Sequence, residues 1–125
     1  MNKEQENTVL KAVKIASTQW QQAFNSGSAI DCATHYEDTA IMYARPFGTF
    51  TGVKEIEGFW QKLIDDGFCD VEYIEPKINV IDEKSAILTS RWKMNNAKGI
   101  IHKELWVIQN DGIAKLREDD FEAES

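Results

Sequence analysis

The run SAILTSRWKMNN at residues 85–96, followed by AKGIIHKELWVIQN at 97–110 and DGIAKLREDDF at 111–121, determines the fold that the sequence predicts. Each run has strand-like length and composition, and turn signals separate them. The dipeptide Asp111-Gly112 is a favoured two-residue hairpin turn. We therefore expect three consecutive antiparallel strands in the last third of the chain.

The central run, residues 100–109, divides its side chains between two faces, because successive side chains of a strand point to opposite sides of the sheet. One face would carry His102, Glu104, Trp106 and Ile108, and the other Ile101, Lys103, Leu105 and Val107. A line of histidine, glutamate and tryptophan is unusual for plain core. This face is therefore the first candidate for a functional site.

The hairpin register decides which residues of the last run meet Glu104. A two-residue loop between positions 110 and 113 places Asp119 opposite Glu104, and a three-residue loop would place Glu118 there, since a slip of one residue reverses the faces. We favour the first register. The same register pairs Arg117 with Trp106 and Phe121 with His102.

Glu104, Asp119 and His102 form the candidate catalytic set. Two carboxylates that face each other in a partly dry pocket cannot both ionise comfortably, so one holds a proton or an arginine lies between them. Arg91 and Arg117 are the candidate counter-ions and ligand contacts. An acid of raised pKa beside a histidine can serve in acid/base catalysis. A structural ion-pair network or a simple ligand-binding role remains open as an alternative.

The earlier part of the chain predicts three helices, at residues 4–24, 28–37 and 53–66. The first has an apolar stripe at helical spacing, and Ser28 can cap the second. Stripe residues of the first and third helices are Leu10, Val13, Ala16, Trp20 and Phe24, then Ile56, Phe59, Trp60, Leu63 and Ile64. The second helix is expected to bury Ile30, Ala33 and Tyr36.

Two further strands are expected, at residues 40–44 and 70–81. Pro76 lies within the second and predicts an edge position or a bulge, because proline cannot donate to a ladder. Three helices followed by a mostly antiparallel sheet give an α+β fold. We expect a cone-shaped sheet curved around the long first helix, in a single domain over residues 1–125, with a pocket in the cone.

Length and charge exclude several functional classes. The 125 residues carry a formal charge of -7, which argues against nucleic acid and anionic membrane surfaces as partners. The start of the chain lacks an apolar signal core, so a cytoplasmic location is the default expectation. Cys32 and Cys69 have no metal-ligand spacing, and His35 lies far from His102. We expect no metal and no cofactor.

Several aromatic residues are candidates to line the pocket, although most aromatics of a small domain belong to its core. The candidate ligand-binding set is Trp20, Tyr43, Phe47, Phe59, Trp60, Arg91, Trp106 and Arg117. Trp92 is left open, because it could instead lie on an outer face with Leu88, Met94 and Leu105. Such an apolar outer face would need a cover, and a second copy of the chain would supply it.

The order of short motifs resembles the nuclear-transport-factor-2-like superfamily, in particular its small SnoaL-like and ketosteroid-isomerase-like branch. The motifs are WQQAFNSG at 20–27, YEDTA at 36–40, PFG at 46–48, Gly52, IEGFW at 56–60, and DG at 111–112 with DDF at 119–121. The resemblance implies a cone-shaped, cystatin-like roll, usually dimeric through the outer sheet face. Members include isomerases, cyclases, dehydratases and epoxide hydrolases, together with binding or assembly modules.

The resemblance also allows a comparison of positions. Where the isomerases have a tyrosine on the first helix, this chain has Trp20. Their basic aspartate falls in the stretch 43–45, which holds no carboxylate, and their protonated aspartate matches Glu104. The sequence predicts a small-molecule pocket protein for a modestly apolar ligand. As an enzyme it would be a cofactor-independent isomerase, cyclase, lyase or hydrolase, and the alternative is a non-catalytic dimerisation or interaction module.

Overall fold

The chain folds into three helices and a curved six-stranded sheet within residues 1–124, the part that the computed structural model describes. The helices are α1 (Lys3–Asn25), α2 (Ala29–Ala33) and α3 (Val53–Asp65). The strands are β1 (Tyr36–Arg45), β2 (Gly48–Thr51), β3 (Glu72–Asp82), β4 (Ser85–Met94), β5 (Ala97–Ile108) and β6 (Ala114–Ala123). The expected α+β class is confirmed.

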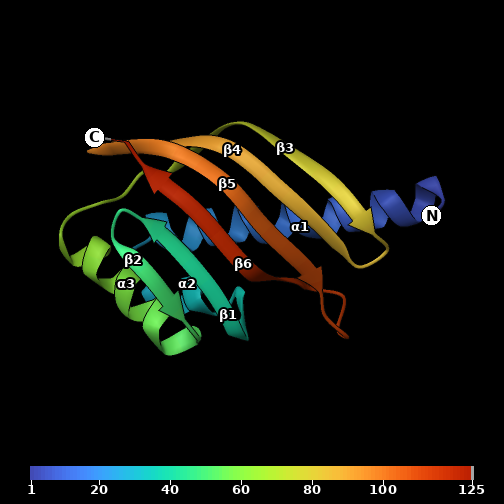
Figure 1. Cartoon of the computed structure of the whole chain (residues 1–125), viewed down its shortest axis with the longest axis horizontal. Helices are drawn as coiled ribbons and strands as arrows, with labels where there is room; N and C mark the ends of the chain where they lie inside the picture. Colours follow the sequence, from blue (N-terminus) through green and yellow to red (C-terminus); the bar gives the residue numbers. More distant parts are fainter. Residues whose placement is uncertain (125) are drawn as a thin grey trace.

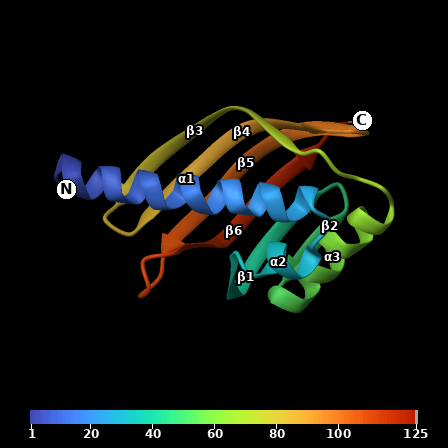
Figure 2. The same ribbon diagram turned by 180° about the vertical axis from the view of Figure 1, so that it is seen from behind.

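The strands are ordered β2-β1-β6-β5-β4-β3, and only the β1–β6 pair is parallel. Helix α1 crosses one face of the curved sheet, and α2 and α3 lie beneath its β1–β2 end (Figures 1 and 2). The expected cone around the first helix is therefore confirmed, with β2 and β3 as open edges. No helix within residues 1–124 combines the length and apolar character that a membrane span requires.

Helix α1 begins with a capping box that satisfies free backbone donors of its first turn. The Asn2 side chain accepts from the Gln5 backbone N–H at 2.8 Å, and the Gln5 side chain accepts from the Asn2 N–H at 3.0 Å. Its buried face presents Val9, Val13, Ala16, Trp20 and Phe24 to the sheet, at the expected helical spacing. This face positions Trp20 over the concave side of the sheet.

The segment after α1 differs from the expectation. Ser28 caps α2 as predicted, its hydroxyl accepting from the Asp31 N–H at 3.1 Å, but the helix has only five residues. Ile30, expected to be buried, is 64% exposed. Tyr36 is instead the first residue of β1, which is longer than predicted, and β2 was not predicted. Tyr36 is thereby buried in the core, beside the candidate site.

Pro76 lies on an edge strand and within a bulge, so both alternatives for this residue hold. The register between β3 and β4 shifts between Ile74 and Lys77, where Glu75 has a φ of 53°. Glu75 and Pro76 thus oppose the single residue Ser90 of β4, and a bulge of this kind bends the strand that carries it.

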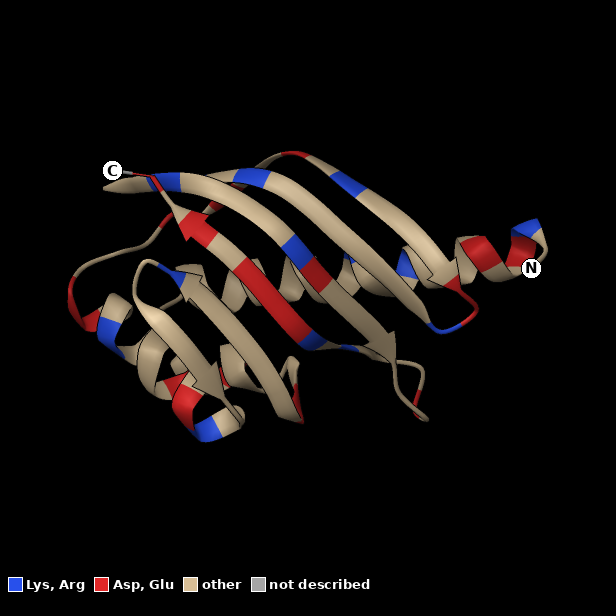
Figure 3. Cartoon of the chain, in the orientation of Figure 1, with Lys and Arg blue, Asp and Glu red and all other residues tan. Residues whose placement is uncertain are grey.

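Ion pairs cover the outer face of the sheet. Arg45 Nε lies 3.0 Å from Asp120 Oδ1, and Lys103 Nζ lies 3.1 Å from Glu118 Oε2. Figure 3 marks the acidic and basic positions along the β5 and β6 ribbons. The β5–β6 hairpin is therefore strongly polar on this side.

The alternative left open for Trp92, an apolar outer face with Leu88, Met94 and Leu105, does not hold for three of these four residues. Leu88 and Trp92 are 2% and 6% exposed on the concave side, and Met94 is partly buried against the core there. These three residues share one face of β4, because even numbers of positions separate them along the strand. Only Leu105 points outward.

Candidate functional site

Strands β5 and β6 hold Glu104 opposite Asp119, as the sequence predicts. The loop that joins these strands is nevertheless the alternative one. The Gln109 N–H donates to the Ile113 carbonyl at 2.9 Å, which leaves a three-residue loop at 110–112. By itself this loop would bring Glu118 opposite Glu104.

A bulge at Arg117 restores the Glu104–Asp119 pair. Trp106 is paired with Leu116, and Leu105 with Glu118, so Arg117 is an extra residue on β6. The expected pairing of Arg117 with Trp106 is therefore wrong. The bulge adds one residue to β6, so the residues after Arg117 face the opposite side of the sheet from the side that the loop alone would give them. Asp119, and not Glu118, therefore lies opposite Glu104.

A second bulge, on β5, removes His102 from the site. His102 is an extra residue between Ile101, which is paired with Phe121, and Lys103. The imidazole lies on the outer face, where its Nε2 atom is 2.9 Å from Glu122 Oε1. The predicted placement of His102 beside the carboxyl pair, opposite Phe121, is wrong, because strict alternation fails at this residue.

The two carboxyl groups are buried and hydrogen-bonded. Glu104 is 3% exposed and Asp119 is 4% exposed. The Tyr73 hydroxyl donates to Glu104 Oε2 at 2.8 Å, and the Trp106 indole N–H donates to Oε1 at 3.0 Å. The Tyr36 hydroxyl donates to Asp119 Oδ2 at 2.7 Å. Within residues 1–124 no side chain or backbone group donates to Asp119 Oδ1, so this oxygen is available to a ligand.

Burial raises the pKa of both carboxyl groups. For Glu104 the negative charge of Asp119 raises the pKa further, and the hydrogen bonds from Tyr73 and Trp106 oppose part of this rise. For Asp119 burial is again the largest cause, and the bond from Tyr36 acts in the opposite direction. Desolvation penalises the charged form of an acid. The pair therefore retains a proton at neutral pH.

The expected counter-ions are not in the pocket. Arg91 Nη2 lies 3.0 Å from Glu75 Oε1, and Arg117 Nε lies 2.8 Å from Glu37 Oε1, both on the outer face. No lysine, arginine or histidine of residues 1–124 lines the cavity around Glu104. A buried carboxyl pair avoids two adjacent negative charges either through a neighbouring cation or by keeping a proton. Because no cation of residues 1–124 lies in the cavity, this pair keeps a proton.

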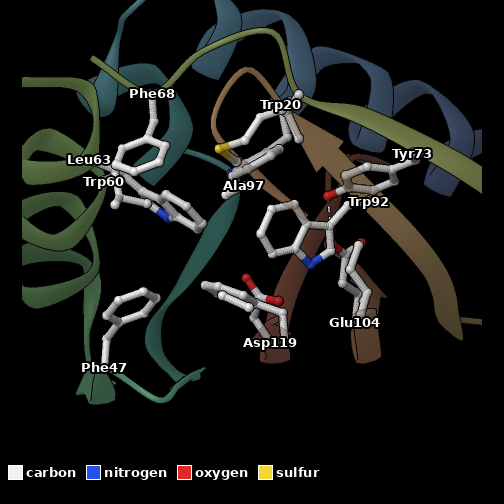
Figure 4. Close-up of a pocket in the computed structure, with 15 residues that line it drawn as sticks. Trp20, Phe47, Trp60, Leu63, Phe68, Tyr73, Trp92, Ala97, Glu104 and Asp119 are labelled. Atoms are coloured by element: carbon white, nitrogen blue, oxygen red, sulfur yellow. Dashed lines mark hydrogen bonds between the residues drawn. The ribbon is translucent and has the colours of Figure 1, made fainter. Parts of the chain in front are cut away.

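The carboxyl pair faces a cavity of about 80 Å³. Its lining is Trp20, Phe47, Trp60, Leu63, Phe68, Val71, Tyr73, Trp92, Met94, Ala97, Ile101, Glu104, Asp119, Phe121 and Ala123. Figure 4 shows rings from several elements gathered around the two carboxyls. Phe47 is 55% exposed and marks the open side of the cavity. The site is thus a pocket with aromatic walls in which Glu104 and Asp119 are the acidic groups.

The predicted aromatic contacts divide into three groups. Trp20, Phe47 and Trp60 line the cavity. Phe59 and Trp106 are buried behind it, and Trp106 acts through its hydrogen bond to Glu104. Tyr43 points to the outer face, where the Arg45 guanidinium lies 6.0 Å from its ring centre. Its predicted place in the pocket is wrong, since it alternates with the inward-facing Met42 and Ala44.

Three residues of the site were missed or left open by sequence reasoning. Tyr73 and Trp92 line the cavity, and Tyr36 holds Asp119 from behind while accepting from the Trp60 indole N–H at 3.2 Å. A Cβ at Gly99 would clash with the Glu122 carbonyl oxygen and lie 2.7 Å from the Trp92 ring, so the glycine opposite Trp92 leaves room both for β6 and for the indole. That pairing of a glycine with a tryptophan is the sequence signal for the inward position of Trp92.

The arrangement has the parts for proton transfer between two points of a bound molecule. A protonated carboxyl can donate to a ligand oxygen, and an ionised carboxyl can accept a proton from it. The apolar walls keep the interaction strong because they exclude water. Within residues 1–124 no group of three histidine, cysteine or acidic side chains is placed to hold a metal ion.

Comparison with known proteins identifies the fold and nothing narrower. No protein-family model matches the chain, and no curated protein matches it in sequence. A ketosteroid isomerase-like protein from Erwinia carotovora atroseptica matches with a TM-score of 0.79 and 15% identity, over 100% of this chain and 99% of that one. A candidate scytalone dehydratase from Novosphingobium aromaticivorans has a TM-score of 0.82 and 12% identity, over 99% and 89%. An NTF-2 like protein of unknown function from Shewanella oneidensis has a TM-score of 0.76 and 14% identity, over 90% and 98%.

These matches identify the fold of the chain. The chain has the nuclear-transport-factor-2-like fold, which also occurs in solved proteins described as cystatin-like. The fold expected from the motif order is thereby confirmed. Since the identities are low, the reactions of the matched proteins are not transferred by the fold itself.

Proposed function

We propose that this protein binds a small, mostly apolar molecule in the aromatic pocket and exchanges a proton with it through Glu104 and Asp119. The observation that carries the proposal is the buried carboxyl pair, which has donors on both groups but no cation in the cavity. Perturbed acids in a pocket are typical of functional sites.

The geometry supports different roles for the two groups. Asp119 has a free oxygen, Oδ1, and is the candidate base that accepts a proton from the ligand. Burial and the charge of Asp119 raise the pKa of Glu104 even though two donors bind its oxygens, so Glu104 is the candidate acid that keeps its proton. The names of two structural neighbours, an isomerase-like protein and a candidate dehydratase, describe reactions that move protons.

Binding is tested with single-ring compounds, because the cavity is small. Cyclohexene and cyclohexanone are titrated into the protein, and backbone amide signals are followed by NMR. Ala97→Phe adds a ring to the cavity wall and should abolish binding, while Ile113→Phe on the exposed β5–β6 loop should leave binding unchanged. If neither ring binds, or if Ala97→Phe binds both normally, the pocket proposal is wrong.

Proton exchange is tested separately in deuterated water. The protein should accelerate exchange of the hydrogens next to the cyclohexanone carbonyl, and Asp119→Asn should remove the acceleration because it removes the base. Glu104→Gln should reduce it. Normal acceleration in both variants would disprove the acid/base role and leave only ligand binding.

The second candidate is a homodimer or interaction module that uses the outer sheet face. Ile100 is 38% exposed there, and Leu105 and Val107 are partly exposed. These side chains lie among ion pairs, which makes the face less apolar than the sequence predicted. Light scattering at micromolar concentration distinguishes the candidates, and Ile100→Glu should dissociate a dimer formed by this face.

A further inference from the structure

A second cavity lies between helix α1 and the β3 edge of the sheet. Its volume is about 480 Å³, compared with about 80 Å³ for the aromatic pocket. The two cavities share Tyr73 as a lining residue, but neither Glu104 nor Asp119 lines the larger one. Small-molecule sites typically have volumes of about 300–1,000 Å³. This second cavity, which we call the α1–β3 groove, therefore has the size of a ligand site.

The two walls of the α1–β3 groove differ in polarity. Helix α1 supplies residues at helical spacing, which share one face of the helix: Leu10, Lys14, Ser17, Thr18 and Gln21. The sheet supplies a mostly apolar wall, formed by Tyr73, Pro76, Ile78 and Leu88. The hydroxyl of Tyr73 already donates to Glu104 at 2.8 Å. A molecule that fills the groove therefore needs an apolar side for the sheet and a polar group for the helix.

The dimensions of the groove fit an extended chain. From Leu10 to Gln21 the helix wall is about 16 Å long, because each helical residue rises by about 1.5 Å. A volume of about 480 Å³ over this length leaves a cross-section of about 30 Å², whereas a helix about 10 Å in diameter needs about 80 Å². The groove is thus too narrow for a docked helix, and an unbranched alkyl chain is narrow enough to enter it.

Lys14 determines which charge the groove attracts. Among residues 1–124 it is the one charged residue that lines the groove, and it takes part in none of the ion pairs of that part of the chain. The residues one helical turn away from it carry no acid: Leu10, Lys11, Ser17 and Thr18. In a chain with a formal charge of -7, this unpaired ammonium group beside an apolar wall favours a singly charged anion.

We infer that the α1–β3 groove binds an unbranched alkyl chain that ends in a carboxylate, with the carboxylate at Lys14 and the chain along the apolar sheet wall. This is a second binding site, and its ligand has the opposite requirement to that of the aromatic pocket, where two acids and no cation of residues 1–124 disfavour an anion. The inference does not depend on the proposed function.

A series of ligands with matched chains tests the inference on the wild-type protein. Octanoate, octanol and octylammonium differ only in the headgroup, and each is titrated while the backbone amide signals of α1 and β3 are followed by NMR. Octanoate should bind about twofold to fivefold more tightly than octanol, which is the range of an exposed ion pair, and octylammonium should bind most weakly. Equal or tighter binding of octanol or octylammonium, or unmoved signals at Lys14, Thr18 and Ile78, would overturn the inference.

The chain length tests the apolar wall separately. Hexanoate has two methylene groups fewer than octanoate, and each buried methylene should tighten binding by about twofold to fourfold. Hexanoate should therefore bind about fourfold to sixteenfold more weakly. Equal affinities of the two acids would show that the alkyl chain does not lie along the sheet wall, and would overturn the inference.

Two pairs of variants at exposed positions of α1 locate the site. Lys14→Gln should lower octanoate affinity about twofold to fivefold and leave octanol affinity unchanged, while Lys11→Gln, outside the groove, should change neither. Thr18→Trp fills the groove and should abolish octanoate binding, whereas Gln19→Trp on the neighbouring exposed position should preserve it. Equal effects within either pair would contradict the assigned site.

A variant of the aromatic pocket distinguishes the two cavities. Ala97→Phe narrows that pocket and should leave octanoate affinity as it is in the wild type, because Ala97 does not line the α1–β3 groove. Loss of octanoate binding in Ala97→Phe but not in Thr18→Trp would place octanoate in the aromatic pocket and overturn the inference. Failure of octanoate to bind at all would also overturn it and would leave the proposed function standing, since that function is tested with cyclohexanone.

Discussion

Acidic side chains have opposite environments on the two faces of the β5–β6 hairpin. On the outer face Glu118, Asp120 and Glu122 each lie within 3.1 Å of a lysine, arginine or histidine nitrogen, and water reaches them. On the inner face Glu104 and Asp119 are buried, bonded to neutral donors, and have raised pKa values.

This contrast shows that position in the fold, and not residue type, determines what an acid does here. An ion pair between exposed side chains contributes little to stability, because water screens the pair. Burial without a neighbouring cation penalises the charged form of an acid and raises its pKa. Neighbours in the sequence, such as Asp119 and Asp120, therefore have different environments.

The largest effect is expected from placing a cation on the inner face. Asp119→Lys forces a long charged side chain into the buried space opposite Glu104 and removes the acceptor of the Tyr36 hydroxyl, so the free energy of unfolding should fall by about 3–5 kcal/mol. The matched change Asp120→Lys breaks the exposed pair with Arg45 and should have little effect. Urea denaturation measures both. Equal losses at the two positions would show that the faces do not differ as described.

The next effect is the pH dependence of stability that the inner acids produce. Because the folded state keeps protons that the unfolded chain releases above about pH 4, stability should fall as pH rises toward neutral, until the buried carboxyls ionise. The slope is about 1.4 kcal/mol per pH unit for each group that stays protonated only when folded.

The control for this pH profile is the double variant Glu104→Gln with Asp119→Asn, which has no titratable group in the pocket. Its stability relative to that of the wild type should increase from pH 5 to pH 8 in denaturation experiments. A constant difference across that range would mean that the two carboxyls have ordinary pKa values.

A smaller loss is expected when the inner acids lose a donor. Tyr36→Phe removes the hydroxyl that donates to Asp119 and accepts from Trp60, and should cost about 1–3 kcal/mol. It should also raise the pKa of Asp119, since the hydrogen bond from Tyr36 favours the ionised form. Tyr43→Phe on the outer face is the control and should be nearly neutral. An unchanged pH profile in Tyr36→Phe would show that this bond does not tune Asp119.

The smallest effect is expected at His102. Because the imidazole lies on the outer face beside Glu122, His102→Ala should leave ligand affinity and proton exchange unchanged, with only a slight change in stability. NMR titration with cyclohexanone and the deuterium exchange assay measure this. A large loss of exchange in His102→Ala would return His102 to the catalytic set.

Much of the fold could be predicted from the sequence because its local patterns are strong. The stripe from Val13 to Phe24 and the Ser28 cap fix the first helix and the start of the second. The pairing of Glu104 with Asp119 was also predicted, although through a loop that the chain does not use.

The face of each residue near a bulge could not be predicted in the same way. A bulge requires only one extra residue, and His102 and Arg117 are polar residues that alternation places as readily inside as outside. The error at His102 and the wrong counter-ion role of Arg117 have this one cause. Tyr36 was assigned to a helix because burial alone does not separate a short helix from the start of a strand.

The bulges at His102 and Arg117 also separate the short strand segments that carry Glu104 and Asp119 from the rest of the hairpin. Between them only three residue pairs follow their own register, Lys103 with Asp120, Glu104 with Asp119, and Leu105 with Glu118. The strand segments on either side pair one step out of phase with this insert. The two inward-facing residues of this segment can therefore be substituted, by evolution or by design, while the hairpin loop and the strand ends keep their pairing partners. Such substitutions would change the chemistry of the pocket and leave the surrounding strands in place.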